Sequence, residues 1–425
     1  MRTRLGVLAI LAVGWLGFLL YAYPGYLSFD SIVQLREARS GVFTDWHPPA
    51  MAFLWRLVEH VIRGPFGMLT LQTTTFLVGG YLLLARYLKP LVAAIFAVVL
   101  FWLPPVSSTM AVIWKDSQMT GYLLLGLGLL LSERARTRYI GLALLLVATT
   151  MRHNGFTFTL PLIVILWRWP WQGAKRYAAS LGLWLATTLV AFGINGALTE
   201  VKMHPWHGSI ALHDIAGTLR YANANDDEIR ADLVGVPMTA TDHLYERLRA
   251  TYVPAAGVFP LVAFIPQPID DTQRAAVQAA WKRVVSAYPG SYLKHRYKVF
   301  KHVLGVTDPH GPIWVGTDTA GADLYEDRPS ETQASMRDWM LQVVANSWSV
   351  RPFLYMIVII ALLYNVVKSR DRFLIALASS AIISEAVLFF VSPTPDFRYS
   401  LWLVPTAFIL VITLFLTRAR SLRKV

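Results

Sequence analysis

The sequence predicts an all-α polytopic membrane protein with about ten transmembrane helices and an outward-facing α or α+β domain. Of its 425 residues, 55% are hydrophobic and only 15% are charged, whereas soluble domains carry about 25% charged residues. Apolar runs long enough to cross roughly 30 Å of hydrocarbon recur along the chain. Short basic loops separate many of these runs, as the positive-inside rule describes for cytoplasmic loops.

Ten segments have the length and apolar content of membrane spans. The first follows Arg2 and Arg4 and lacks a small-residue cleavage site, so we interpret it as a retained helix rather than a cleaved signal peptide. The two short segments that flank Arg152 are expected to tilt or to cross incompletely. The expected spans are 5–22, 66–85, 88–105, 117–132, 139–151, 156–169, 178–198, 350–367, 373–392 and 400–417.

The charges between the spans predict the orientation. If Arg2 and Arg4 are cytoplasmic, alternation makes every inward loop and the C-terminal tail basic. The chain is then expected in a bacterial inner membrane with both termini in the cytoplasm. The net charge of +13 follows from this topology and does not indicate a nucleic-acid partner. The loops expected on the periplasmic side are 23–65, 106–116, 152–155, 199–349 and 393–399.

Composition divides the chain into three parts. Residues 1–198 are expected to form an N-terminal transmembrane module, and residues 350–425 supply the last helices and a basic tail. Residues 199–349 are polar, with mixed charge, and long enough for an outward-facing soluble domain. Helices are expected there near 268–287 and 291–304, and the second is basic and aromatic enough to lie on an anionic membrane surface. The chain has no cysteine, which excludes disulfides and thiolate metal sites.

The first outward loop combines an acidic residue, short amphipathic helices and a proline pair. Asp30 lies just beyond the first span, and a short helix is expected from Asp30 to Arg39. An aromatic and acidic patch follows, and Pro48-Pro49 then suits the start of a second interfacial helix over 49–63, where a missing N–H costs little.

This order of features resembles the GT-C glycosyltransferases, in particular the protein mannosyltransferase and aminoarabinose lipid A transferase branch. Those enzymes often have an Asp-Glu pair where this chain has Asp30-Ser31, and Lys-Pro-Pro where it has His47-Pro48-Pro49. The resemblance covers about the first 200 residues and the last helices, and leaves 199–349 unmatched.

Three further motifs on the same expected face extend the resemblance. The family carries a second acidic residue at the start of a span, and relatives often have Lys-Gly-Pro at a later turn and an Arg-Tyr motif near the C-terminal helices. The corresponding segments here are Trp114-Lys115-Asp116, Arg152-His153-Asn154-Gly155 and Asp396-Phe397-Arg398-Tyr399.

The resemblance implies inverting transfer of a sugar from a polyprenyl-phosphate carrier to a glycan, lipid or protein acceptor on the periplasmic face. Such a transfer needs a carboxylate base, cations for the departing phosphate and an apolar groove for the prenyl chain. Asp30 is the candidate base, and Asp116 is the second catalytic candidate. The candidate substrate-binding residues are Asp45, His47, Lys115, Arg152, His153, Arg398 and Tyr399.

The resemblance leaves metal dependence open because members of the superfamily differ in it, and a divalent cation held by Asp116 or Asp45 is the one cofactor considered. Ser31 replaces the family's second acidic residue and so disfavours a two-carboxylate cation site at that position. The metal ligands stay unassigned.

Each candidate residue also has a structural explanation. Asp30 and Asp116 could cap the helices that follow them, and Arg152 and Arg398 could reach the headgroups as interfacial charges. Glu385 lies inside an expected span, where it should face the bundle interior and pair with a cation. Four further polar residues show no compact metal-ligand spacing and are expected to be ordinary loop residues: His204, His207, His213 and Asp214.

Two other functions compete with transfer. A flippase or transporter of lipid-linked sugars would place charges near mid-membrane and have related halves, whereas the charges here lie at span ends and no repeat is evident. A scaffold for envelope assembly would depend on 199–349. The sequence has no Walker loop, Rossmann fingerprint or nucleophile elbow, which disfavours ATP-driven pumps and soluble nucleotide-sugar enzymes.

Overall fold

The structure is a computed structural model that describes residues 2–239, 243–261, 265–267, 270–307, 324 and 329–422. In these residues the regular elements are helices, and β pairing is limited to two isolated bridges, one of which joins Tyr26 to Val112. The helices are α1 (Arg2–Ala22), α2 (Phe29–Ser40), α3 (Ala50–Glu59), α4 (Phe66–Leu84), α5 (Pro90–Trp102), α6 (Pro104–Met110), α7 (Lys115–Leu130), α8 (Ala135–Thr150), α9 (Gly155–Leu166), α10 (Gly173–Leu198), the π-helix η1 (Trp206–Ala211), α11 (Leu212–Tyr221), α12 (Asp226–Asp232), α13 (Leu244–Thr251), η2 (Phe259–Leu261), α14 (Asp271–Ala287), α15 (Pro289–Val303), α16 (Glu331–Ala345), η4 (Trp348–Val350), α17 (Pro352–Ser369), α18 (Arg372–Val391), η5 (Phe397–Ser400) and α19 (Leu403–Leu422).

Within the described residues, six helical segments are long and apolar enough to cross a membrane: α1, α4, α10, α17, α18 and Phe397–Leu416. A seventh crossing results if α5 and α6 count as one span. These segments indicate a multi-pass membrane protein. Helices are also present where the shorter spans were predicted. Of these, α7 and α8 have 16 residues each and α9 has 12, so they are shorter than the six segments above.

The segment 88–105, predicted as one span, is broken. The chain turns by 72° between α5 and α6. Leu103 is extended at this point, because Pro104 disfavours helical backbone in the residue before it and cannot donate the next helical hydrogen bond.

Small residues allow close packing at the centre of the bundle. A Cβ on Gly79 of α4 would lie 2.3 Å from the backbone nitrogen of Leu125 in α7, and one on Gly141 of α8 would lie 2.4 Å from that of Leu130. Glycine at such interfaces is typical of membrane helices, whose association depends on tight van der Waals contact.

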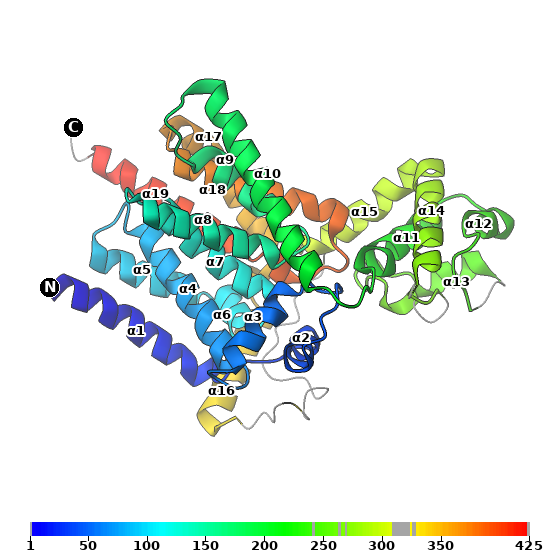
Figure 1. The fold of residues 1–425 in the computed structure, drawn as a ribbon, viewed down its shortest axis with the longest axis horizontal. Helices are drawn as coiled ribbons and strands as arrows, with labels where there is room; N and C mark the ends of the chain where they lie inside the picture. Colours follow the sequence, from blue (N-terminus) through cyan, green and yellow to red (C-terminus); the bar gives the residue numbers. More distant parts are fainter. Residues whose placement is uncertain are drawn as a thin grey trace.

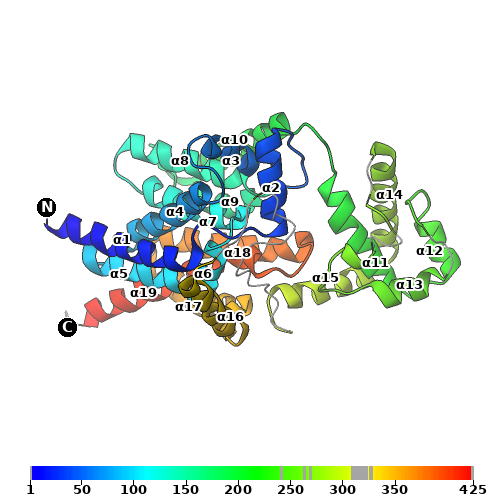
Figure 2. The ribbon, with the colours of Figure 1, turned by 90° about the horizontal axis from the view of Figure 1, so that it is seen from below.

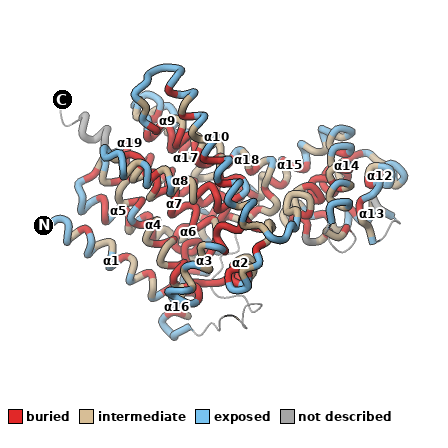
Figure 3. Tube along the Cα trace, in the orientation of Figure 1, coloured by how far each residue is buried: buried red, intermediate tan, exposed pale blue. Residues whose placement is uncertain are grey.

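Many residues of the peripheral helices are exposed, whereas the centre of the bundle is buried (Figure 3). Large apolar residues are among the exposed ones. Leu8 of α1, Leu189 of α10 and Val367 of α17 are each about 60% exposed. Lipid-facing surfaces of membrane helices have this character, whereas soluble proteins seldom expose large apolar patches.

A second hydrophobic core lies beyond the end of the bundle. We call η1 and helices α11 to α15 the outer unit; its core is built mainly from α11 and α14. Figures 1 and 2 show α11 to α14 at the end of the molecule opposite both termini, with α15 running back toward α18.

The predicted 199–349 region therefore contains two packing environments. Its last helix, α16, contacts α1 and α6 and contributes Met340 and Val344 to the bundle core. The basic helix predicted near 291–304 is present as α15, but its expected position on a membrane surface does not fit His295 and Arg296, which are fully buried.

Candidate active site

Hydrogen bonds between the starts of α2 and α7 position Asp30. Ser28 caps α2 and forms a capping box with Ser31. The Ser31 hydroxyl donates to the carbonyl of Ile113 at 2.8 Å, and the Trp114 indole donates to the Ser28 hydroxyl at 2.6 Å. Because Ser28 caps α2, the Asp30 side chain in the first turn does not serve as the cap. It faces the start of α7 instead.

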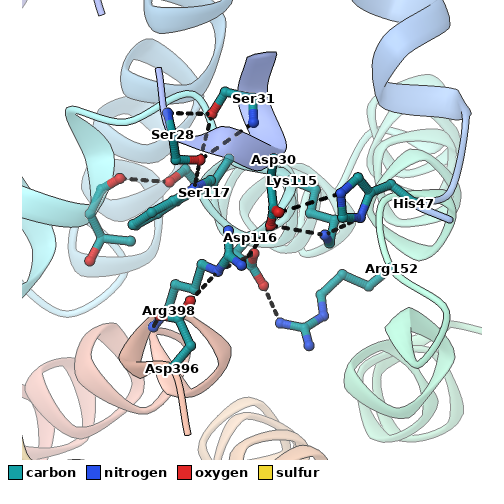
Figure 4. A network of polar contacts seen from close by, with 12 residues as sticks. Ser28, Asp30, Ser31, His47, Lys115, Asp116, Ser117, Arg152, Asp396 and Arg398 are labelled. Carbon is teal, nitrogen blue, oxygen red and sulfur yellow. Dashed lines mark hydrogen bonds and ion pairs between the residues drawn. The ribbon is translucent and has the colours of Figure 1, made fainter. Parts of the chain in front are cut away.

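Asp30 lies among three basic side chains (Figure 4). Its Oδ2 is 2.6 Å from Nη2 of Arg398 and 3.9 Å from Nζ of Lys115, and its Oδ1 is 3.6 Å from Nε2 of His47. Lys115 Nζ donates to Nδ1 of His47 at 2.8 Å. This bond leaves the His47 proton on Nε2, directed at Asp30.

The environment makes Asp30 anionic and His47 neutral. Burial opposes ionisation of Asp30, but Arg398, His47 and Lys115 together hold the pKa of its carboxyl well below its usual range. Burial, reinforced by the Lys115 charge, lowers the pKa of the His47 imidazole even though Asp30 acts in the opposite direction. The Asp30 side chain keeps about a fifth of its surface exposed, so its carboxylate can be reached from the cavity.

Asp116 and Arg152 form a second, more buried ion pair. Arg152 Nη1 contacts Asp116 Oδ1, and Arg152 Nε donates to the Asn154 side-chain oxygen at 3.0 Å. The Arg152 guanidinium also lies 4.5 Å from the ring centre of Tyr399, within cation–π range. The Asp116 side chain is only 1% exposed, so this pair ties α7 to the α8–α9 turn.

Arg398 connects the two carboxylate groups. It lies in η5, where its Nε is 2.7 Å from Asp396 Oδ2 and 3.8 Å from Asp116 Oδ2. Its guanidinium lies 4.7 Å from the Trp114 ring centre. Sequence reasoning did not select Asp396, although its place two residues before Arg398 in the same motif was the available signal.

A cavity of about 420 Å³ opens beside these charges. Its polar lining includes Asp30, His47, Lys115, Arg152, His153 and Arg398. The apolar lining comes from four parts of the chain, which contribute Phe156, Ile210, Val258, and the pair Val387 and Val391. Ligand cavities commonly combine an apolar wall with a few convergent polar groups.

Asn154 is a second residue that sequence reasoning missed. It lines the cavity, and its buried Nδ2 has no hydrogen-bond partner in the described part of the chain. A buried donor of this kind is costly unless a ligand or water accepts its hydrogen bond. The clue in the sequence was its place two residues after Arg152.

The structure brings together eight of the nine candidate residues. Seven have been described above, and His153 also lines the cavity. Asp45 is separate: its Oδ1 accepts a hydrogen bond from the backbone nitrogen of Met203, and it is not part of the cavity lining. Glu385 of α18, expected to pair with a cation, instead accepts a hydrogen bond from the Ser400 hydroxyl at 2.9 Å.

The carboxylates as arranged do not fit a resident divalent cation. In the described residues no group of three or more His, Asp or Glu side chains has the arrangement of a metal site. Asp30, Asp116 and Asp396 each contact a guanidinium. A metal ion, which prefers several oxygen ligands, would have to displace these arginines.

Comparisons with known family models, with curated proteins and with solved structures found no match to this chain.

Proposed function

We propose that this protein is an integral-membrane glycosyltransferase that moves a sugar from a polyprenyl-phosphate donor to an envelope glycan, lipid or protein acceptor. The observation that carries the proposal is the cavity in which an accessible Asp30 carboxylate lies beside Lys115 and Arg398 and next to an apolar wall. Glycosyl transfer to a hydroxyl from a lipid-phosphate carrier needs these three features together.

The proposed topology has ten spans, with α7, α8 and α9 completing the set. Both termini are cytoplasmic, and the cavity and the outer unit face the periplasm of a bacterial inner membrane. The basic loops between the proposed spans support this orientation. The position of both termini at the end opposite the outer unit is consistent with it (Figure 1).

In the proposed reaction the acceptor hydroxyl attacks the anomeric carbon of the donor sugar. Asp30 accepts the hydroxyl proton as the new C–O bond forms, and the bond between the anomeric carbon and the phosphate oxygen breaks with inversion. The departing polyprenyl phosphate gains negative charge, which Arg398 and Lys115 stabilise in a site largely removed from water. The prenyl chain lies against Val387 and Val391 of α18.

Donor binding also activates the base. Before the donor binds, Arg398 is 2.6 Å from Asp30 and makes its carboxylate a weak base. A donor phosphate that accepts hydrogen bonds from Arg398 draws the guanidinium away from Asp30. The pKa of Asp30 then rises toward the value that proton transfer requires, so the base is strengthened only when substrate is present.

The test is a transfer assay with purified protein in proteoliposomes that contain radiolabelled polyprenyl-phosphate sugars and an envelope extract as the acceptor pool. We expect label to pass to an acceptor, and no passage with any donor would refute the proposal. The same vesicles without acceptor test a flippase, which would move donor across the bilayer without consuming it.

A further inference from the structure

The outer unit contains a fully buried ionic cluster that the proposed reaction does not use. Asp214 Oδ1 is 2.7 Å from Nε of Arg296 and 3.0 Å from Nε2 of His295, and its Oδ2 accepts a hydrogen bond from the Trp281 indole at 2.9 Å. Tyr252 and His295 are joined by a 2.6 Å hydrogen bond. Arg296 has no exposed side-chain surface, so its orientation is fixed by these neighbours.

Arg296 also reaches out of the outer unit. Its Nη1 donates to the carbonyl of Ser392, at 3.1 Å, where α18 ends. One side chain therefore joins Asp214 of α11 to the first residue of the turn that leads to η5. We call residues 392–396 the η5 turn.

Hydrogen bonds continue from this point to the candidate active site. The Ser392 hydroxyl donates to the carbonyl of Thr394 at 2.7 Å, and the backbone nitrogen of Asp396 donates to the same carbonyl at 3.1 Å. The Asp396 carboxylate then pairs with Arg398 at 2.7 Å. The path from Arg296 to Arg398 is thus a contiguous series of short polar contacts.

The outer unit contacts the η5 turn at a second point. Gly257 has a φ of +62°, and a Cβ there would lie 2.6 Å from both the carbonyl oxygen of Pro393 and Cγ2 of Thr394. Pro393, Thr394 and the neighbouring Val258 line the cavity. The turn that carries Asp396 and Arg398 is therefore held between Arg296 and Gly257.

We propose that the buried Asp214–Arg296 pair positions Arg398 for the donor phosphate by holding the η5 turn. Arg296 is a positioning residue, and this inference depends on the proposed function because its effect is read through donor use. The outer unit then has a direct part in the reaction, because its folding places a phosphate ligand of the candidate active site.

Arg296→Lys separates positioning from folding. Lysine keeps a positive charge beside Asp214, but its single ammonium cannot bridge Asp214 and the Ser392 carbonyl as the guanidinium does. We expect the full chain in detergent to keep a cooperative melting transition, because the positive charge beside Asp214 remains. We expect the donor KM to rise about tenfold, the effect of losing a hydrogen bond from a charged group, while the acceptor KM is unchanged.

The matched control is Arg283→Lys. Arg283 also donates to backbone carbonyls, those of Asp232 and Val234, but these lie within the outer unit. Wild-type donor KM is expected for this variant. Gly257→Ala is a second test if Arg296→Lys loses its melting transition, because it displaces the η5 turn without altering the Asp214–Arg296 pair; it should raise donor KM in the same way.

A double-mutant cycle with Arg398→Lys decides the mechanism. If Arg296 acts through Arg398, adding Arg296→Lys to Arg398→Lys causes no further rise in donor KM. The inference would be overturned if the increases in donor KM of the two single variants multiplied in the double variant, or if Arg296→Lys had a wild-type donor KM. Either result would leave the proposed function intact. Absence of transfer by the wild-type protein would instead refute the function itself.

Discussion

Asp30→Asn is the most informative single substitution in this protein. Asparagine has nearly the same shape and its amide oxygen can still accept the hydrogen bond from Arg398, so the fold around the start of α2 should persist. The substitution removes the only group that we propose as the proton acceptor. A positioned general base contributes about 10²- to 10⁴-fold to a rate, and we expect kcat to fall by that factor.

The same substitution should not weaken donor binding, although it lowers kcat. The Asp30 carboxylate lies 2.6 Å from Arg398 and 3.9 Å from Lys115, so it competes with the donor phosphate for both cations. At about 4 Å a pair of unit charges near a protein surface interacts by roughly 4 kcal/mol, and solvent at the partly exposed carboxylate reduces this figure. Removing the competing charge should leave the donor KM unchanged or lower it.

The assay measures initial transfer rates over a range of donor concentrations for the wild type, Asp30→Asn and the control Asp227→Asn. Asp227 is an exposed carboxylate of the outer unit, and its variant should behave as the wild type. A kcat reduced less than tenfold in Asp30→Asn would show that Asp30 is not the base. A raised donor KM with unchanged kcat would make it a binding residue instead.

Three other predictions test the electrostatics of the chain. Arg152→Met leaves the buried Asp116 without its main partner, so we expect about 3–5 kcal/mol of lost stability and a lower melting temperature; an unchanged melting temperature would contradict the ion pair. In the outer unit, burial lowers the pKa of His213 to about 3 and also lowers that of His295. His213 stays neutral in the folded state while the unfolded chain takes up a proton at this residue below pH 6.5, so stability should fall as pH drops from 7 to 5, by up to about 1.4 kcal/mol per pH unit for His213. The lowered pKa of His295 acts in the same direction, and His213→Phe should flatten the decline seen in melting temperature. Transfer should persist in excess EDTA because arginines already occupy the carboxylates, and loss that Mg²⁺ restores would contradict this.

Much of the helical pattern follows from local signals in the sequence. The apolar runs, Pro48-Pro49 and the polar start of α2 each predict a helix from nearby residues alone, and helices are present at those places. The break at Leu103 also had a local signal in Pro104 and Pro105, but the long apolar run around them favoured one continuous span. Apolar content and length are properties of a whole segment, whereas the bend depends on the backbone conformation of the single residue before Pro104.

The assignment of partners within the site could not be predicted in the same way. The motifs indicated that Asp30, Lys115, Arg152 and Arg398 share one face, but which cation pairs with which carboxylate depends on packing between distant segments. The same limit applies to Arg296, which looked like part of a basic surface. Its partner Asp214 lies about 80 residues earlier and is brought near only by the packing of α11 on α15.

The pairing pattern also divides the cations by their availability to a phosphate. Arg152 is held by a carboxylate that is almost fully buried, and separating them would leave an unpaired charge in the interior. Arg398 and Lys115 face the partly exposed Asp30, whose carboxylate can be solvated or protonated when they turn to a ligand. The donor phosphate should therefore exchange with Asp30 for these two cations, and Arg152 should act mainly by fixing Asp116 and the α8–α9 turn. Base activation and phosphate binding are then one event, because the cations that bind the leaving group are those that suppress the base before the donor arrives.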